Sequence, residues 1–172
     1  MEQRQMANSH PRHSEKKFSV RNAKASDVPQ VIALDAENTG LAKPEYWEDL
    51  YERYSSKADE QETDANGKSV KRHRFFLVCA DGDTMLGFII GEVRSWEFGS
   101  PPCGWIFAIG VRNDVRQGGV GNTLFEAICD RFRKQSVGKV RTMLARDDRL
   151  VMSFFRSQGM MAGPFIQLEK DL

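Results

Sequence analysis

A cluster of glycines behind an arginine is the part of this chain best suited to chemistry. It reads Arg116-Gln-Gly-Gly-Val-Gly121. Residues 105–111 before it form an apolar run typical of a strand, and residues 119–135 repeat apolar side chains at the spacing of one helical face. Such a strand–loop–helix joint directs several backbone N–H groups, and the positive end of a helix, toward one point. Because glycine has no Cβ, a ligand can approach closely, and we expect this loop to bind a phosphate-bearing ligand.

Two familiar phosphate-binding loops do not fit this cluster. No Gly-Lys-Ser or Gly-Lys-Thr follows the glycines, so the loop is not a P-loop. Leu124 stands where the third glycine of a dinucleotide-binding fingerprint belongs. The remaining alternative is a tight glycine turn that binds nothing and only lets the helix pack against the strand.

Composition places the chain among ordinary globular proteins. It has 172 residues, enough for one domain with a core, a hydrophobic fraction of 40% and a net charge of +1. Neither nucleic acid nor a membrane is therefore an expected partner. The three cysteines, Cys79, Cys103 and Cys129, lack the spacing of metal ligands. Their odd number predicts reduced thiols in a cytoplasmic protein without a metal.

Short strands and helices must position the glycine loop. Residues 1–16 are polar and are predicted to be a disordered tail, and residues 17–172 are predicted to form a single domain. Periodicity predicts strands over residues 18–22, 74–80, 84–94, 105–111, 139–145 and 163–170, and helices over residues 28–38, 44–54, 119–135 and 148–158. A turn at Asp81-Gly-Asp indicates an antiparallel hairpin, whereas the crossover helix makes the strand over residues 139–145 parallel to that over residues 105–111. We therefore expect an α/β fold with a mixed, mostly antiparallel central sheet flanked by helices.

The glycine loop and the order of elements resemble the GNAT acetyltransferase superfamily. The R-x-x-G-x-G pattern of the loop follows a core strand, and the order β-α-α-β-β-β-α-β-α-β extends over about residues 18–170. Residues 154–160 also resemble the family's late-helix motif, in which an aromatic residue precedes a glycine by four positions. The resemblance implies an N-acetyltransferase that moves an acetyl or short acyl group directly from acyl-coenzyme A to a primary amine of a small molecule or protein. Many members form dimers, so a homodimer is among the expected states.

The resemblance also implies which residues contact the coenzyme. Main-chain N–H groups of residues 117–122 would hold the diphosphate beside the Arg116 charge, and the strand edge at Ile109 and Val111 would pair with the amide arm. A main-chain N–H near Val111 would polarise the thioester carbonyl. The full set is Ile109, Val111, Arg116, Gln117, Gly118, Gly119, Val120, Gly121, Asn122, Asp148 and Phe155.

Two of these positions depart from the family pattern. Asp148 stands where members often carry an asparagine beside the pantetheine arm. Phe155 stands where many members carry a tyrosine that is proposed as the general acid, and a phenyl ring cannot donate a proton. We favour the interpretation that the low thiol pKa of coenzyme A makes a dedicated acid unnecessary.

Candidates for the base and for acceptor contacts lie elsewhere in the chain. Glu92 and Glu97 are carboxylates that could take the amine proton through a water, although Glu92 could equally be a strand residue paired with Arg94. By resemblance Tyr46 and Trp47 would contact the acceptor, and core packing is the alternative for Trp47. The missing tyrosine and the lack of a decisive base also leave open a non-catalytic regulatory module that binds coenzyme A.

Overall fold

A five-stranded sheet forms the centre of the protein. The computed structural model describes residues 18–54 and 73–172, and the predicted tail over residues 1–16 lies outside them. The strands are β1 (Ser19–Asn22), β2 (Arg74–Asp81), β3 (Thr84–Arg94), β4 (Cys103–Val111) and β5 (Val140–Thr142), in that spatial order. The first three pairings are antiparallel, and β5 is parallel to β4. This arrangement confirms the predicted mixed, mostly antiparallel sheet.

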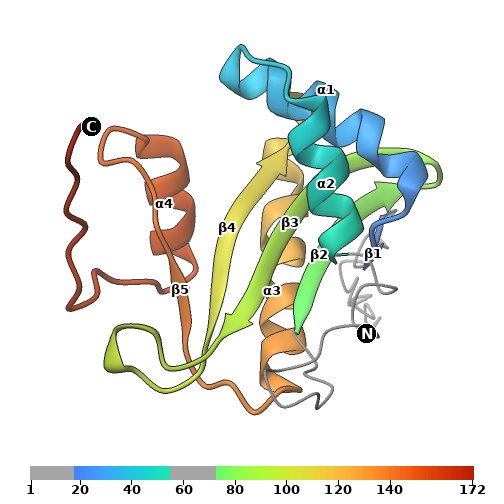
Figure 1. The fold of residues 1–172 in the computed structure, drawn as a ribbon. Helices are drawn as coiled ribbons and strands as arrows, with labels where there is room; N and C mark the ends of the chain where they lie inside the picture. The colour runs from blue at the N-terminus through green and yellow to red at the C-terminus, as the bar shows by residue number, and fades with distance from the viewer. Residues whose placement is uncertain (1–17, 55–72) are drawn as a thin grey trace, which may run out of the picture.

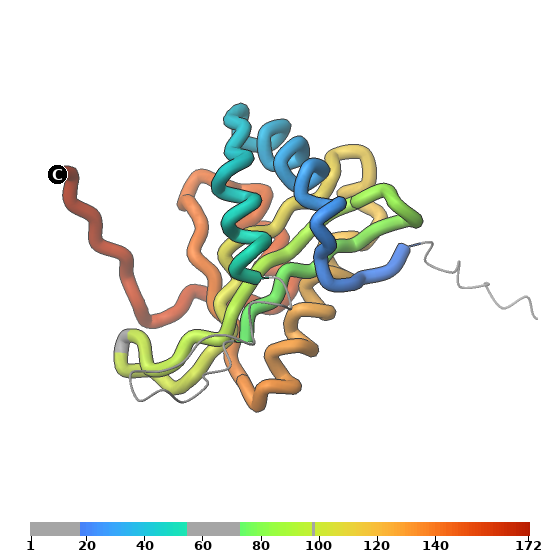
Figure 2. The backbone as a smooth tube through the Cα atoms, turned by 45° about the vertical axis from the view of Figure 1, so that its right-hand side comes forward, coloured from blue at the N-terminus to red at the C-terminus, as the bar shows by residue number. Residues whose placement is uncertain are grey.

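Helices cover both faces of this sheet (Figures 1 and 2). One face carries α1 (Val28–Thr39) and α2 (Pro44–Tyr54), and the other carries α3 (Val120–Arg133), with α4 (Arg149–Ser157) beyond β5. Alternation along β2 explains the two cores, because Phe76 and Val78 pack toward α1 and α2 whereas Leu77 and Cys79 pack toward α3. Residues 18–54 and 73–172 also contain the short 3-10 helices η1 (Ala25–Asp27), η3 (Glu97–Gly99) and η4 (Asn113–Gly118).

A buried ion pair fixes the entrance to α1. The Arg21 guanidinium donates to both carboxylate oxygens of Asp27, at 2.6 and 2.9 Å, and the Lys24 N–H donates to Asp27 at 2.7 Å. Burial alone would raise the pKa of Asp27, but the hydrogen bonds from Arg21 and Lys24 outweigh burial and leave the pKa below its ordinary value. The ionised carboxylate therefore ties β1 to the start of α1.

One extra residue in β4 separates that strand from β5. Ile90 pairs with Ala108 and Gly91 pairs with Ile106, so Phe107 has no counterpart on β3 and forms a bulge. Pairing between β4 and β5 extends only from Gly104 to Ile106. Beyond the bulge the two segments diverge, as Figure 1 shows. We call this divergence between β4 and the chain that follows β5 the fork.

The structure differs from the predicted elements at the C-terminal end. The final strand predicted over residues 163–170 is wrong, because this segment has no regular structure and is exposed, leading away from the body of the protein (Figure 2). Its alternating pattern suits a strand, but no neighbouring strand pairs with it. The strand predicted over residues 139–145 is also shorter, since β4 turns away from it at the bulge.

The cysteines Cys79, Cys103 and Cys129 are all buried. Burial raises the pKa of the Cys129 thiol to about 11.

Within residues 18–54 and 73–172, each helix is too short or too polar to cross a bilayer.

Candidate active site

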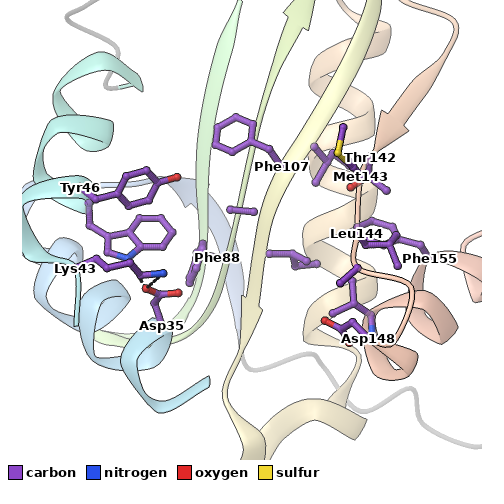
Figure 3. A pocket seen from close by; sticks show the side chains of 16 residues that line it. Asp35, Lys43, Tyr46, Phe88, Phe107, Thr142, Met143, Leu144, Asp148 and Phe155 are labelled. Atoms are coloured by element: carbon purple, nitrogen blue, oxygen red, sulfur yellow. Dashed lines mark hydrogen bonds and ion pairs between the residues drawn. The ribbon is translucent and has the colours of Figure 1, made fainter. Parts of the chain in front are cut away.

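A pocket of about 470 Å³ lies at the fork. Its middle is formed by Phe107, Ala108 and Ile109 of β4. One wall comes from the α1–α2 side and carries Asp35, Lys43, Tyr46 and Trp47. The opposite wall comes from α4 and from the segment between β5 and α4, and it carries Met143, Asp148 and Phe155. Figure 3 shows these two walls facing one another with β4 between them. The pocket is therefore lined by elements from both sides of the sheet, so two ligands entering from opposite sides could meet there.

The wall from α1 and α2 combines aromatic rings with one ion pair. The Trp47 indole donates to Asp35 Oδ2 at 2.8 Å, and Lys43 Nζ lies 2.9 Å from the same oxygen. Trp47 is buried and packs edge-on against Phe88, with ring centroids 5.2 Å apart, whereas Tyr46 is 45% exposed. Trp47 therefore lines the pocket and also belongs to the core, and its contact with an acceptor stays a prediction.

Five of the 16 residues that line this pocket were named from the sequence, and the other eleven were missed, among them Asp35, Lys43 and Phe107. Phe107 lies within an apolar strand, where nothing distinguishes it from a core residue. Asp35 is one of several acidic residues on α1 and α2, and the sequence gives no signal that it faces inward.

The glycine loop combines open space with a free helix terminus. Gly119 has φ 80° and precedes α3, whose first N–H groups, from Val120 to Asn122, have no partners within the helix. A Cβ built on Gly118 or Gly119 meets nothing within 4 Å. A Cβ on Gly121 would lie 3.0 Å from the Phe154 ring, so this glycine serves the packing of α3 against α4. The loop is not part of the pocket lining and lies past the end of β4.

Arg116 makes different contacts from those expected. Its Nη2 donates to Asn38 Oδ1 at 2.9 Å, and its Nε donates to the Val111 carbonyl at 3.3 Å. The guanidinium therefore links the loop to α1 and to the end of β4. Asn122 also has a structural contact, because its side-chain oxygen accepts a hydrogen bond from Gln158 on the α4 side at 3.0 Å.

The other residues expected to contact the coenzyme divide between the pocket and its surroundings. Ile109 lines the pocket, whereas Val111 does not. Asp148 lines it and accepts a hydrogen bond from the Val151 N–H at 3.0 Å, which makes Asp148 the N-cap of α4. Phe155 lines it too, and packs against Phe154 with ring centroids 5.2 Å apart.

The two candidate bases lie outside the pocket lining. The Tyr54 hydroxyl donates to Glu92 Oε2 at 2.6 Å, and Arg94 Nε donates to Oε1 at 2.9 Å. The Tyr54 ring packs against Phe107 with centroids 5.5 Å apart, which connects Glu92 to the pocket through one side chain. Burial and the neighbouring Glu92 raise the pKa of Tyr54 well above its ordinary value. Glu97 is exposed, and its Oε2 lies 3.6 Å from Arg94 Nη1.

Comparison with protein families decides the identity of the fold. A profile of the acetyltransferase (GNAT) family matches residues 41–160. This chain belongs to the GNAT acetyltransferase family. The matched range contains the fork, the glycine loop and α4, and a search of curated proteins gave no match.

Solved structures, two of them of N-acetyltransferases, share this fold at low sequence identity. The aminoglycoside N-acetyltransferase AAC(6')-Iy in complex with coenzyme A has a TM-score of 0.71 and 14% identity, covering 95% of this chain and 99% of its own. A glucosamine-6-phosphate N-acetyltransferase from Arabidopsis thaliana has a TM-score of 0.62 and 18% identity, covering 90% and 97%. A transcriptional regulator from Bacillus halodurans C-125 has a TM-score of 0.70 and 13% identity, covering 90% and 99%. At these identities the likeness concerns the fold.

The described residues also bear on metal binding. Among residues 18–54 and 73–172, no group of three or more His, Cys, Asp or Glu side chains is placed to hold a metal ion.

Proposed function

We propose that this protein is an N-acetyltransferase that moves an acetyl or short acyl group from acyl-coenzyme A to a primary amine of a small molecule or protein. The observation that carries the proposal is the pocket at the fork, which is lined from both sides of the sheet. Such a pocket lets a thioester and an amine approach each other from opposite sides, as direct transfer requires.

The residues past the end of β4 fit a phosphorylated coenzyme. Gly118 and Gly119 border open space, and the first N–H groups of α3 are unpaired within the helix, as an anion site needs. In this proposal residues 117–122 hold the diphosphate and the edge of β4 at Ile109 and Val111 holds the amide arm. Arg116 acts by bracing the loop, since its guanidinium is already engaged by Asn38 and Val111. Acyl-coenzyme A supplies the activated thioester carbonyl.

Proton removal is assigned to Glu92, acting through a water. Glu92 does not line the pocket, but its partner Tyr54 packs against the lining residue Phe107. Glu97 is the weaker candidate because it is exposed and does not line the pocket either. Phe155 lies in the pocket where it can pack against a ligand but cannot donate a proton. The leaving thiolate is therefore proposed to depart without a dedicated acid.

A titration of acetyl-coenzyme A against loop variants tests the phosphate site. Gly118→Glu places a carboxylate in open space without left-handed backbone strain, and Gly138→Glu does the same far from the loop. We expect Gly118→Glu to weaken binding by at least about tenfold through charge repulsion, while Gly138→Glu binds like the parent. Equal affinity for all three proteins would rule out the proposed diphosphate site.

A second candidate function is a non-catalytic module that binds coenzyme A. Two observations favour it: Glu92 is held by Tyr54 and Arg94, and Phe155 replaces a potential acid. Release of free thiol from acetyl-coenzyme A across a panel of amines and peptides separates the two functions. Binding without turnover on every acceptor would favour the module.

The cellular setting and the assembly state also remain predictions. We propose a cytoplasmic protein, and a homodimer is one of its expected assembly states. Cell fractionation tests the first expectation, and light scattering of the purified protein tests the second.

A further inference from the structure

An ion pair lies on the pocket wall formed by the α1–α2 side, where Tyr46 and Trp47 are proposed to contact the acceptor. Asp35 comes from α1 and Lys43 from the connection before α2, and both line this wall (Figure 3). The proposed transfer of an acyl group gives neither residue a role.

The carboxylate is the buried member of this pair. The Asp35 side chain is only 11% exposed, whereas that of Lys43 is 34% exposed. Oδ2 of Asp35 accepts from the Trp47 indole and contacts Lys43, and in the described part of the chain Oδ1 accepts no hydrogen bond. A carboxylate can accept about four hydrogen bonds, so this one has unused capacity. A carboxylate withdrawn from water also needs a cation, because its desolvation is otherwise uncompensated.

The cation that Lys43 provides is a primary ammonium on a flexible stem. The amine acceptor of an acetyltransferase is also a primary ammonium before it loses its proton. An incoming acceptor can therefore replace Lys43 on Asp35 with no change in the charge of the pocket, and the displaced lysine returns to water. An anionic acceptor would meet the repulsion of Asp35 instead.

Aromatic surface next to this pair indicates what the ammonium is attached to. Tyr46 is 45% exposed and Phe107 is 36% exposed, and both line the pocket with Trp47 and Phe88. Binding of an apolar group against exposed aromatic rings is favourable because both apolar surfaces leave water. The faces of these rings also attract a cation.

We propose that Asp35 anchors the ammonium of the acceptor, that Lys43 occupies this position in the acceptor-free protein, and that the acceptor carries its amine on an apolar body. This inference rests on the proposed acetyltransferase function and names the chemical class of its acceptor.

Calorimetric binding of simple probes tests the inference without acetyl transfer. The protein is first saturated with coenzyme A, and this step tests the proposed coenzyme site by itself. Phenethylamine, phenethyl alcohol and ethylamine are then titrated separately. We expect phenethylamine to bind at least about tenfold more tightly than the alcohol, which lacks the charge, and than ethylamine, which lacks the apolar body.

Two variants of the ion pair give opposite expected signs. Asp35→Asn keeps an acceptor for Trp47 but loses the charge, so it should weaken phenethylamine binding about tenfold and leave phenethyl alcohol unchanged. Lys43→Met removes the competing ammonium, so it should tighten phenethylamine binding several-fold. Asp49→Asn is the matched control, because Asp49 pairs with Arg53 on the exposed side of α2 and does not line the pocket.

Specific outcomes would overturn the inference. Weaker phenethylamine binding by Lys43→Met would mean that Lys43 helps to bind the acceptor rather than standing in for it. Unchanged phenethylamine affinity in Asp35→Asn, or equal losses for the amine and the alcohol, would make Asp35 a structural residue. Either result can occur while coenzyme A binds and free thiol is still released from acetyl-coenzyme A, so the failure of this inference is distinguishable from failure of the proposed function.

Discussion

Glu92 combines a structural contact with a proposed chemical one. Its two oxygens accept hydrogen bonds from Tyr54 and Arg94, and Tyr54 connects it to the pocket residue Phe107. A base in this position must act through a water, because no part of Glu92 lines the pocket.

Replacing Glu92 by glutamine separates its two roles. If Glu92 takes the amine proton, Glu92→Gln should lower the acetylation rate by roughly a hundredfold and abolish the fall in rate on the acidic side of the pH profile. Thermal unfolding of the same variant measures the structural loss on its own. A variant whose pH profile matches that of the parent would remove Glu92 from catalysis, whatever its stability.

Individual residues also mark the limits of the sequence interpretation. The glycine loop could be located because Gly118 and Gly119 follow an arginine between two strongly periodic segments. The role of Gly121 in packing against Phe154 could not be predicted, because only the structure places the two residues in contact. Asp35 gave no signal, since its burial depends on Trp47 and Lys43, which reach it from the next helix and the connection before it.

At the scale of elements, the entrance to α1 depends on a single carboxylate. Asp27 is buried and ties Arg21 of β1 to the first turn before α1. Its pKa is lowered in the folded protein, so the ion pair contributes stability above the unfolded-state pKa of about 3.9. That stability is lost as the pH falls through the lower folded-state value.

Substitution of Asp27 should therefore have a pH-dependent cost. Asp27→Asn should reduce the free energy of unfolding by about 2 kcal/mol at pH 7, because it replaces charge-assisted hydrogen bonds with neutral ones. The difference from the parent should shrink in acid, where Asp27 is protonated as well. Urea unfolding at neutral and acidic pH measures it, with Asp49→Asn as an exposed control. A difference that stays constant with pH would contradict the ion-pair account.

Most elements followed from the periodicity of single segments. Apolar side chains are concentrated in β2, β3 and β4 and recur at helical spacing in α1 to α4 strongly enough for these elements to be located from the sequence. The prediction of a strand over residues 163–170 was wrong because a strand needs a neighbouring strand to pair with, and an alternating sequence does not supply one. The bulge at Phe107 was also invisible, since an extra residue in an apolar run leaves the local pattern apolar.

At the scale of the whole molecule, one sheet separates two apolar cores. The core with α1 and α2 supports the pocket wall that carries Tyr46 and Trp47. The core with α3 and α4 supports Phe155 and the start of α3. The C-terminal segment belongs to neither core, as Ile166 is 83% exposed and Leu168 is 85% exposed.

Removal of this segment should leave the rest of the protein intact. Deletion of residues 166–172 retains Phe165, which packs on the Arg141 guanidinium, and removes only exposed residues. We expect the melting temperature to change by less than about 2 °C, because little buried surface is lost. Differential scanning calorimetry of the two proteins measures the change. A fall of many degrees would show that the segment stabilises the fold.

The bulge at Phe107 sets which side chains of β4 face each core. Ile106 points to the core with α3, yet Ala108, two positions later, points to the core with α1 and α2. In a regular strand two such positions share a face, so the extra residue reverses inside and outside for everything downstream. If Phe107 were deleted, Ile106 and Ala108 would be consecutive and would alternate as in a regular strand, so these two side chains and Ile109 would keep their cores while the bulge disappeared. Exchanging Phe107 for another side chain would keep the extra residue, and with it the bulge.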